Sequence, residues 1–218
     1  MAPKSSKAKA KKSNVREYAE AIAWAVVLTV LIRMLVVQAF RIPSGSMEDT
    51  LLVGDFLFVN KFIYGAQVTL PLTDKILFRA PKLRDPKVGD IIVFRDPEDL
   101  RQDLIKRCQG VPGDVIEVRD KQLYRNGKPI LQDYVKHIMA DTIPRGVDPR
   151  DNFGPYQVRP NHYFMMGDNR DDSRDSRYLG DVDVALMKGK ALFIYWSWDA
   201  SKPLYKALRF RRLLHILH

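Results

Sequence analysis

The chain has 218 residues, 46% of them apolar, and carries 36 Lys and Arg against 26 Asp and Glu, for a net charge of +10. This length suits one domain of ordinary size with an appendage, and a single cysteine, Cys108, excludes an intramolecular disulfide framework. One cysteine and four dispersed histidines also predict no structural zinc site, and we expect neither a metal nor another cofactor.

The excess positive charge lies at the two ends of the chain. Residues 1–20 sum to +4 and residues 202–218 sum to +5, which leaves only +1 for everything between them. A duplex-binding domain concentrates its basic charge on its folded body. The pattern therefore argues against nucleic acid as a partner and favours the lipids of a membrane surface.

Residues 21–40 form an apolar stretch in which only Thr29, Arg33 and Gln38 are polar. A helix of this length spans a hydrocarbon core of about 30 Å. Six cations precede it in the low-complexity tail at residues 1–20. The positive-inside rule then places that tail in the cytoplasm and the chain after residue 40 outside. We therefore predict one N-terminal transmembrane helix at residues 21–40.

Two alternatives to this anchor stay open. Val37-Gln38-Ala39 offers small residues at the −3 and −1 places of a cleavable secretory signal. The stretch exceeds the usual apolar length of about 7–15 residues and contains an arginine, which favours a retained anchor. The other alternative is a buried helix of a soluble domain.

Short apolar runs cut by Gly, Pro and Asp predict that residues 41–203 are mainly β, a folded sheet or barrel. Asn126-Gly127 predicts a tight hairpin. Residues 64–87 and 136–161 are rich in Pro, Gly and Asp and are expected to be long inserted loops. Strands are expected at residues 55–62, 90–94, 104–109, 115–119, 121–124, 163–167 and 191–198.

The last segment, residues 204–218, mixes cations with large apolar side chains and lacks acids. This composition is typical of a segment that lies in a membrane interface. We therefore predict a basic amphipathic helix on the membrane.

Three polar clusters interrupt the strands, at residues 42–47, 106–114 and 167–177. Each alone is typical of an ordinary feature, namely a linker, a turn and a solvated ion-pair loop. The third cluster also lacks the glycine and terminal glutamate of a calcium-binding EF-hand loop. No function follows from any one of them.

Together the clusters supply a nucleophile and a base. A serine needs a neighbour that removes its proton, and a lysine can do this if burial keeps it neutral. Lys106 follows the apolar pair Leu104 and Ile105, although an outward-facing strand lysine fits the same pattern. A Ser-His arrangement is less favoured, because neither His137 nor His162 lies in a recognisable catalytic context.

In their order and spacing, the three clusters resemble those of bacterial type I signal peptidases. These are membrane-anchored serine peptidases that cut signal peptides from exported preproteins. The resemblance covers the anchor and most of residues 38–198, including a further strand motif at residues 89–94. It implies a β-rich catalytic domain on the outer, periplasmic face of the bacterial cytoplasmic (inner) membrane. It also implies preproteins with small residues before the cut as substrates.

The resemblance implies a role for each matching residue. Ser46 is similar to the nucleophile and Lys106 to its general base. Ser44 matches the serine whose hydroxyl joins the Ser46 N–H in the oxyanion hole, and Ser173 matches the serine that orients the lysine. The residues that match supporting ion pairs are Arg107, Asp168, Asp175 and Arg177.

The chain departs from the family pattern at two positions. Asp49 stands where the family has proline, and Asp172 stands where it has asparagine. Asp172 adds a negative charge that would raise the pKa of Lys106 and oppose its role as a base.

Two other functions fit parts of this pattern. A self-cleaving Ser-Lys regulator would need a DNA-binding domain, and residues 1–20 are too short to supply one. A non-catalytic, membrane-anchored binding module would keep its function after Ser46→Ala, whereas either peptidase would lose it.

Overall fold

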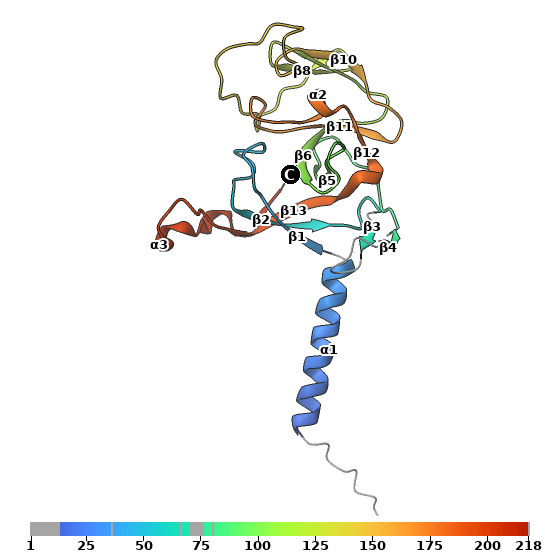
Figure 1. The fold of residues 1–218 in the computed structure, drawn as a ribbon, viewed down its shortest axis with the longest axis vertical. Helices are drawn as coiled ribbons and strands as arrows, with labels where there is room; N and C mark the ends of the chain where they lie inside the picture. The colour runs from blue at the N-terminus through green and yellow to red at the C-terminus, as the bar shows by residue number, and fades with distance from the viewer. Residues whose placement is uncertain (1–13, 36, 66, 70–75, 80, 218) are drawn as a thin grey trace, which may run out of the picture.

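The structure is a computed structural model that describes residues 14–217, apart from residues 36, 66, 70–75 and 80. Most of the expected basic tail, residues 1–13, lies outside the described part. Figure 1 shows one long helix, α1 (Asn14–Leu35), that projects from a body built of strands. The expectation of a mainly β body is confirmed.

Helix α1 presents large apolar side chains that the rest of the protein does not cover. Ile22 is 64% exposed, Trp24 73% and Leu28 58%. Within the described residues, no helix combines the length and hydropathy that a membrane crossing requires.

The expected helix over residues 21–40 is wrong at its outer end, because α1 ends at Leu35 and a strand, β1 (Val37–Arg41), follows. β1 pairs antiparallel with β2 (Asp55–Asn60), from Val37 opposite Asn60 to Arg41 opposite Phe56. The apolar run continues the helical composition, but valine and phenylalanine also suit a strand, and pairing with β2 decides the outcome.

The main sheet contains eight strands in the order β1-β2-β13-β5-β6-β11-β12, with β14 also paired to β13. It brings both ends of the body together, because the late strand β13 lies between the early strands β2 and β5. The remaining bounds are β5 (Ile91–Arg95), β6 (Asp103–Gly110), β11 (His162–Met166), β12 (Val182–Asp183), β13 (Met187–Ser197) and β14 (His215–Ile216).

Buried apolar side chains cover both faces of the central strands of this sheet, since Ile91 and Val93 of β5 belong to one cluster and Ile92 and Phe94 to another. Strand β2 alternates buried and half-buried residues, as expected of a strand with one face covered. Leu57 and Val59 from β2 pack with Ile91 and Val93 from β5 and with Ile194 from β13. The sheet is therefore a rigid base for whatever side chains project from it.

A second sheet of order β10-β7-β8-β9 lies at the far end of the body from α1 (Figure 1). The expected hairpin is confirmed at Asn126 and Gly127, whose φ angles of 53° and 76° join β8 to β9. The bounds are β7 (Val115–Arg119), β8 (Gln122–Arg125), β9 (Lys128–Pro129) and β10 (Phe153–Gln157).

Both expected loops contain strands that the sequence pattern did not reveal. The first holds a small hairpin of β3 (Gln67–Thr69) and β4 (Ile76–Arg79). The second holds β10, where Phe153 and Tyr156 pack their rings 5.3 and 5.9 Å from that of Phe164. Aromatic packing therefore makes a strand of a segment whose Gly and Pro content is typical of a loop.

The expected C-terminal helix is wrong. The segment forms one turn, α3 (Leu204–Ala207), a 3-10 helix, η2 (Phe210–Arg212), and then β14. Arg212 donates to the buried Asp55 at 2.6 Å, and Leu217 joins the core. These contacts with the body replace a continuous helix. Two further short helices are α2 (Ser176–Leu179) and η1 (Val184–Leu186).

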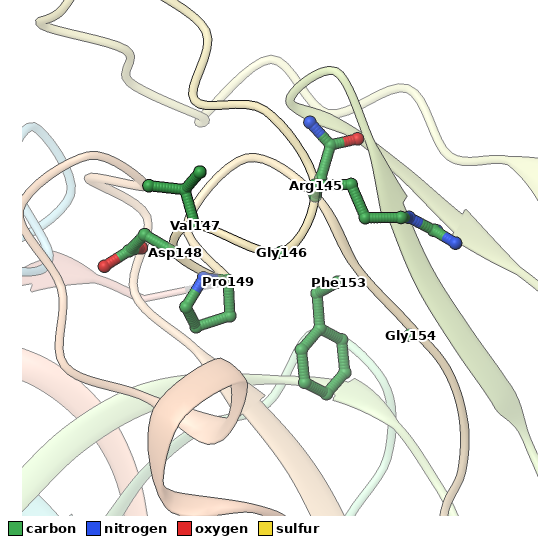
Figure 2. Close-up of a pocket in the computed structure, with 8 residues that line it drawn as sticks. Arg145, Gly146, Val147, Asp148, Pro149, Phe153 and Gly154 are labelled. Carbon is green, nitrogen blue, oxygen red and sulfur yellow. The ribbon is translucent and has the colours of Figure 1, made fainter.

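The second inserted loop, residues 136–161, is called the second excursion below. It contains a shallow pocket, drawn in Figure 2. It is lined by residues 145–149 and 152–154. None of the site residues expected from the sequence lines it.

Candidate active site

The first polar cluster forms a loop between β1 and β2. Met47 and Leu51 are fully buried and anchor it in the core. The loop turns tightly, with the Glu48 N–H donating to the Gly45 carbonyl at 3.0 Å. Ser46 lies at this turn and is only 7% exposed. The core thus holds the candidate nucleophile in one place.

Lys106 lies in the middle of β6, opposite Ile92 of β5, and is 3% exposed. Its Nζ lies 2.5 Å from Ser46 Oγ. Ser46 and Lys106 are 60 positions apart in sequence and are brought together because the Ser46 loop and β6 pack on the same core. The structure therefore joins the nucleophile and the base that the resemblance implies.

Burial is the main influence on the pKa of Lys106 and lowers it to about 8. The negative charge of Asp175 opposes this, and the positive charge of Arg177 reinforces it. Asp172 and Asp168 oppose it further. The expected effect of Asp172 is therefore present, but burial outweighs it.

Arg107, the next residue along β6, forms a buried ion pair with Asp168. Its Nη2 and Nε donate to the carboxylate at 2.8 and 2.9 Å, and its guanidinium stacks 3.9 Å from the Tyr134 ring centroid. Thr50 donates to the same carboxylate at 2.6 Å. Asp168 thus links the Ser46 loop, through Thr50, to strand β6, through Arg107.

Asp175 and Arg177 form a second buried pair, with Nη2 2.9 Å from Oδ2. Burial acts to raise the pKa of Asp175, but the charge of Arg177 and its hydrogen bond outweigh burial and lower it. Asp175 also accepts from the Gly167 N–H at 3.0 Å. The Asp175–Arg177 pair therefore holds the loop after β11 in place beside Lys106.

Ser173 does not form the hydrogen bond to Lys106 that the resemblance implies. Its Oγ is buried and has no hydrogen-bond partner in the described part of the chain. Ser173 packs against Gly167, where an added Cβ would lie 2.2 Å from that Oγ and 2.5 Å from the Ser46 carbonyl oxygen. This close approach holds the hydroxyl beside the Ser46 loop.

The other predicted residues lie at the rim. Ser44 is exposed, two residues before the nucleophile. Asp172 is exposed too, and its carboxylate lies 3.9 Å from where a Gly45 Cβ would be. Asp49, at the position where proline was expected, pairs with Lys136 at 3.0 Å. An ion pair therefore holds this turn.

Two residues that contact the site were given no role from the sequence, Thr50 and Asn169. Thr50 links to Asp168 as described, and Asn169 donates from its backbone N–H to the Ser46 carbonyl at 3.1 Å. Asn169 lies inside the third polar cluster, and Thr50 lies three residues after the end of the first. Their proximity in sequence to Ser46 and Asp168 was the available signal for a role in the site. The residue type of a polar loop residue does not indicate which atoms it contacts.

Comparisons with known proteins agree on one family. The family model described as signal peptidase, peptidase S26, matches residues 15–196. The signal peptidase I of Pseudomonas fluorescens is 36% identical over 217 residues, covering 85% of this chain and 74% of the relative. That of Rickettsia typhi is 32% identical over 255 residues, covering 96% of each. A crystal structure of a signal peptidase I from Enterococcus faecalis is 32% identical, covers 50% of this chain and 98% of its own, and superposes with a TM-score of 0.40.

Proposed function

The chain belongs to the signal peptidase family, peptidase S26, and is a serine endopeptidase that removes signal peptides from secretory preproteins; we propose that Ser46 and Lys106 are its catalytic dyad. The observation that carries this proposal is the 2.5 Å contact between Ser46 Oγ and a buried Lys106 Nζ. The lowered pKa of Lys106, about 8, makes its neutral form available near neutral pH.

In the first half of the reaction, neutral Lys106 takes the Ser46 proton while Oγ attacks the scissile carbonyl carbon. The negative charge that develops on the carbonyl oxygen is held by the Ser46 N–H and the Ser44 hydroxyl. The Lys106 ammonium then gives its proton to the leaving amine, and the signal peptide remains as an ester on Ser46.

In the second half, Lys106, neutral again, takes a proton from a water molecule that attacks the ester. The tetrahedral intermediate collapses and returns the proton to Ser46 Oγ. The two buried ion pairs, Arg107 with Asp168 and Arg177 with Asp175, keep their charges compensated while Lys106 changes its protonation state.

The substrate is proposed to bind as an added strand. β1 stands at the end of the sheet order and leads directly into the Ser46 loop. An edge strand offers unpaired backbone groups to an extended peptide. Small pockets then reject large side chains at the first and third positions before the cut.

We also propose that the enzyme is held in the bacterial cytoplasmic membrane by the apolar segment beginning at residue 21, with its catalytic domain on the outer face. The support is the uncovered apolar surface of α1, represented by Trp24 and Ile22, together with the basic residues before it. Protease added outside sealed spheroplasts should digest the body but not an epitope tag on residues 1–12.

The C-terminal segment is proposed to touch the same membrane. Tyr205, Phe210, Leu214 and Ile216 are 61–81% exposed and lie among exposed cations. In the reconstituted full chain, a polarity-sensitive dye on Phe210→Cys should shift to the blue with anionic vesicles. The same dye on Val147→Cys, which is 76% exposed in the second excursion, should not.

The test of the dyad compares two substitutions with matched controls. Ser46→Ala and Lys106→Arg should each abolish cleavage of a preprotein, because an alanine cannot attack and a guanidinium stays protonated. The controls are Ser201→Ala and Lys188→Arg, both away from the dyad, and they should cleave normally. Full activity of either site variant would refute the dyad, and retained function of Ser46→Ala would instead support a binding module.

A further inference from the structure

Asn169 lies in the loop after β11 and is 1% exposed. It makes two hydrogen bonds to the nucleophile loop. Its backbone N–H donates to the Ser46 carbonyl at 3.1 Å, and its side-chain Nδ2 donates to the Gly45 carbonyl at 3.3 Å. Asn169 therefore holds the carbonyls of two successive peptide units.

The first of these units contains the N–H of interest. The Gly45 carbonyl and the Ser46 N–H belong to the same planar peptide group. Under the proposed function, this N–H donates to the oxyanion. Any group that fixes the Gly45 carbonyl therefore also fixes the direction of the oxyanion donor.

Asn169 is itself held from the opposite side. The Lys136 N–H donates to the Asp168 carbonyl at 2.8 Å, and the Arg170 N–H donates to the Lys136 carbonyl at 3.0 Å. These two bonds bracket Asn169 in a parallel bridge with Lys136. The side chain of Lys136 in turn pairs with Asp49. The backbone hydrogen bonds to Lys136 thus fix the position of Asn169.

The hydrogen bond also acts through the electrons of the peptide group. A donor on a carbonyl oxygen polarises the amide and makes its N–H a stronger donor. The Gly45 carbonyl already accepts from the Glu48 N–H at 3.0 Å, which forms the turn. The Asn169 amide adds a second donor, and this one can be removed by changing a side chain.

Packing alone does not explain an asparagine here. Its Oδ1 is buried and has no hydrogen-bond partner among the described residues. An unpaired buried acceptor is unfavourable, and an apolar side chain of similar size would avoid that penalty. The amide thus leaves one buried acceptor unpaired, and the group that it does engage is the Gly45 carbonyl.

We propose that Asn169 is a positioning residue that orients and polarises the Gly45–Ser46 peptide group so that its N–H binds the oxyanion. The inference rests on the proposed function of Ser46. Asn169 then contributes to the stabilisation of the transition state, because the oxyanion that the N–H binds develops only there.

The test is Asn169→Leu in the full chain, with Asn152→Leu as the matched control. Asn152 donates to Asp120 in the β7–β8 turn and to the Ile143 carbonyl in the inserted loop at residues 136–161, rather than to the nucleophile loop. For Asn169→Leu, kcat should fall about tenfold, less than the roughly hundredfold or greater loss when an oxyanion donor is deleted. KM and the acid limb of the pH profile should not move, and the unfolding midpoint should be unchanged or higher. The control should keep its kcat.

A second variant guards against a folding defect. Asn169→Asp keeps the shape of the side chain but, when ionised, cannot donate to the Gly45 carbonyl. Its kcat on the alkaline plateau should fall by a similar factor. In both variants the backbone 15N resonance of Ser46 should move upfield, which reports the lost hydrogen bond on the preceding carbonyl.

The outcomes separate this inference from the dyad. If kcat of both Asn169 variants stays at the wild-type value while Ser46→Ala is inactive, the positioning role is overturned and the dyad stands. If the loss in Asn169→Leu appears in KM or shifts the acid limb instead, the role is likewise overturned. An active Ser46→Ala enzyme would overturn the dyad itself.

Discussion

The pH dependence of cleavage follows directly from the burial of Lys106. In the proposed dyad, only the neutral amine of Lys106 accepts the Ser46 proton, and the Lys106 pKa of about 8 sets the neutral fraction. That fraction is about one half at pH 8, about one tenth at pH 7 and about one hundredth at pH 6. We therefore expect kcat/KM to rise about tenfold per pH unit below pH 8 and to level off above it.

The perturbation that sharpens this prediction is Asp172→Asn. The carboxylate of Asp172 raises the pKa of Lys106 against the dominant effect of burial, so its removal should move the acid limb to lower pH. The height of the alkaline plateau should stay the same, because Asp172 is exposed and touches neither reacting group.

The assay is the cleavage of an internally quenched peptide with alanine at the first and third positions before the cut. The purified full chain is used in detergent micelles, from about pH 6 to about pH 10. Lys106→Arg, inactive at every pH, serves as the blank. A kcat/KM that stays flat down to pH 6, or an acid limb that Asp172→Asn moves upward, would refute this account of the base.

Three further substitutions test the buried groups. Lys106→Met should stabilise the fold by about 3 kcal/mol at pH 7, because a fall in pKa from 10.5 to about 8 costs 1.36 kcal/mol per unit; urea unfolding should show this gain below pH 8 and its loss as the pH rises through 10.5. Asp168→Asn should destabilise by about 3–5 kcal/mol in the same experiment, since it removes the carboxylate that compensates the buried charge of Arg107; an unchanged midpoint would contradict the ion pair. Gly167→Ala should cost about 1–3 kcal/mol and lower kcat, because its methyl would meet the Ser46 carbonyl oxygen at 2.5 Å; wild-type kinetics would show that the site has more room than the structure gives it.

The sequence motifs predict two site residues that the structure brings together, whereas several of the elements around them differ from the expectation. Ser46 and Lys106 belong to short motifs whose chemistry is visible in the residue types. Strand β1 was assigned to a helix because its apolar composition suits both structures, and its pairing with β2 depends on residues about twenty positions away. The C-terminal helix failed for the same reason, since Asp55, its partner for Arg212, lies 157 residues away.

Finer contacts depended on distances that no sequence pattern contains. The hydroxyl of Ser173 lies beside Gly167 rather than on the lysine, and the amide of Asn169 reaches the Gly45 carbonyl. Both follow from how closely the loop after β11 approaches the Ser46 loop. Composition indicates that such loops are polar, whereas packing determines which polar atoms meet.

The dyad joins residues 60 positions apart, and the link from Thr50 to Asp168 spans 118. Each contact of this range closes a long loop, and the entropy of that closure is lost before the contact gains any stabilisation. Activity therefore requires the main sheet to be complete, with the late strand β13 inserted between two early ones. A nascent or partly folded chain holds its serine and its lysine apart. The insertion of β13 between two early strands thus keeps this peptidase inactive until the sheet is complete.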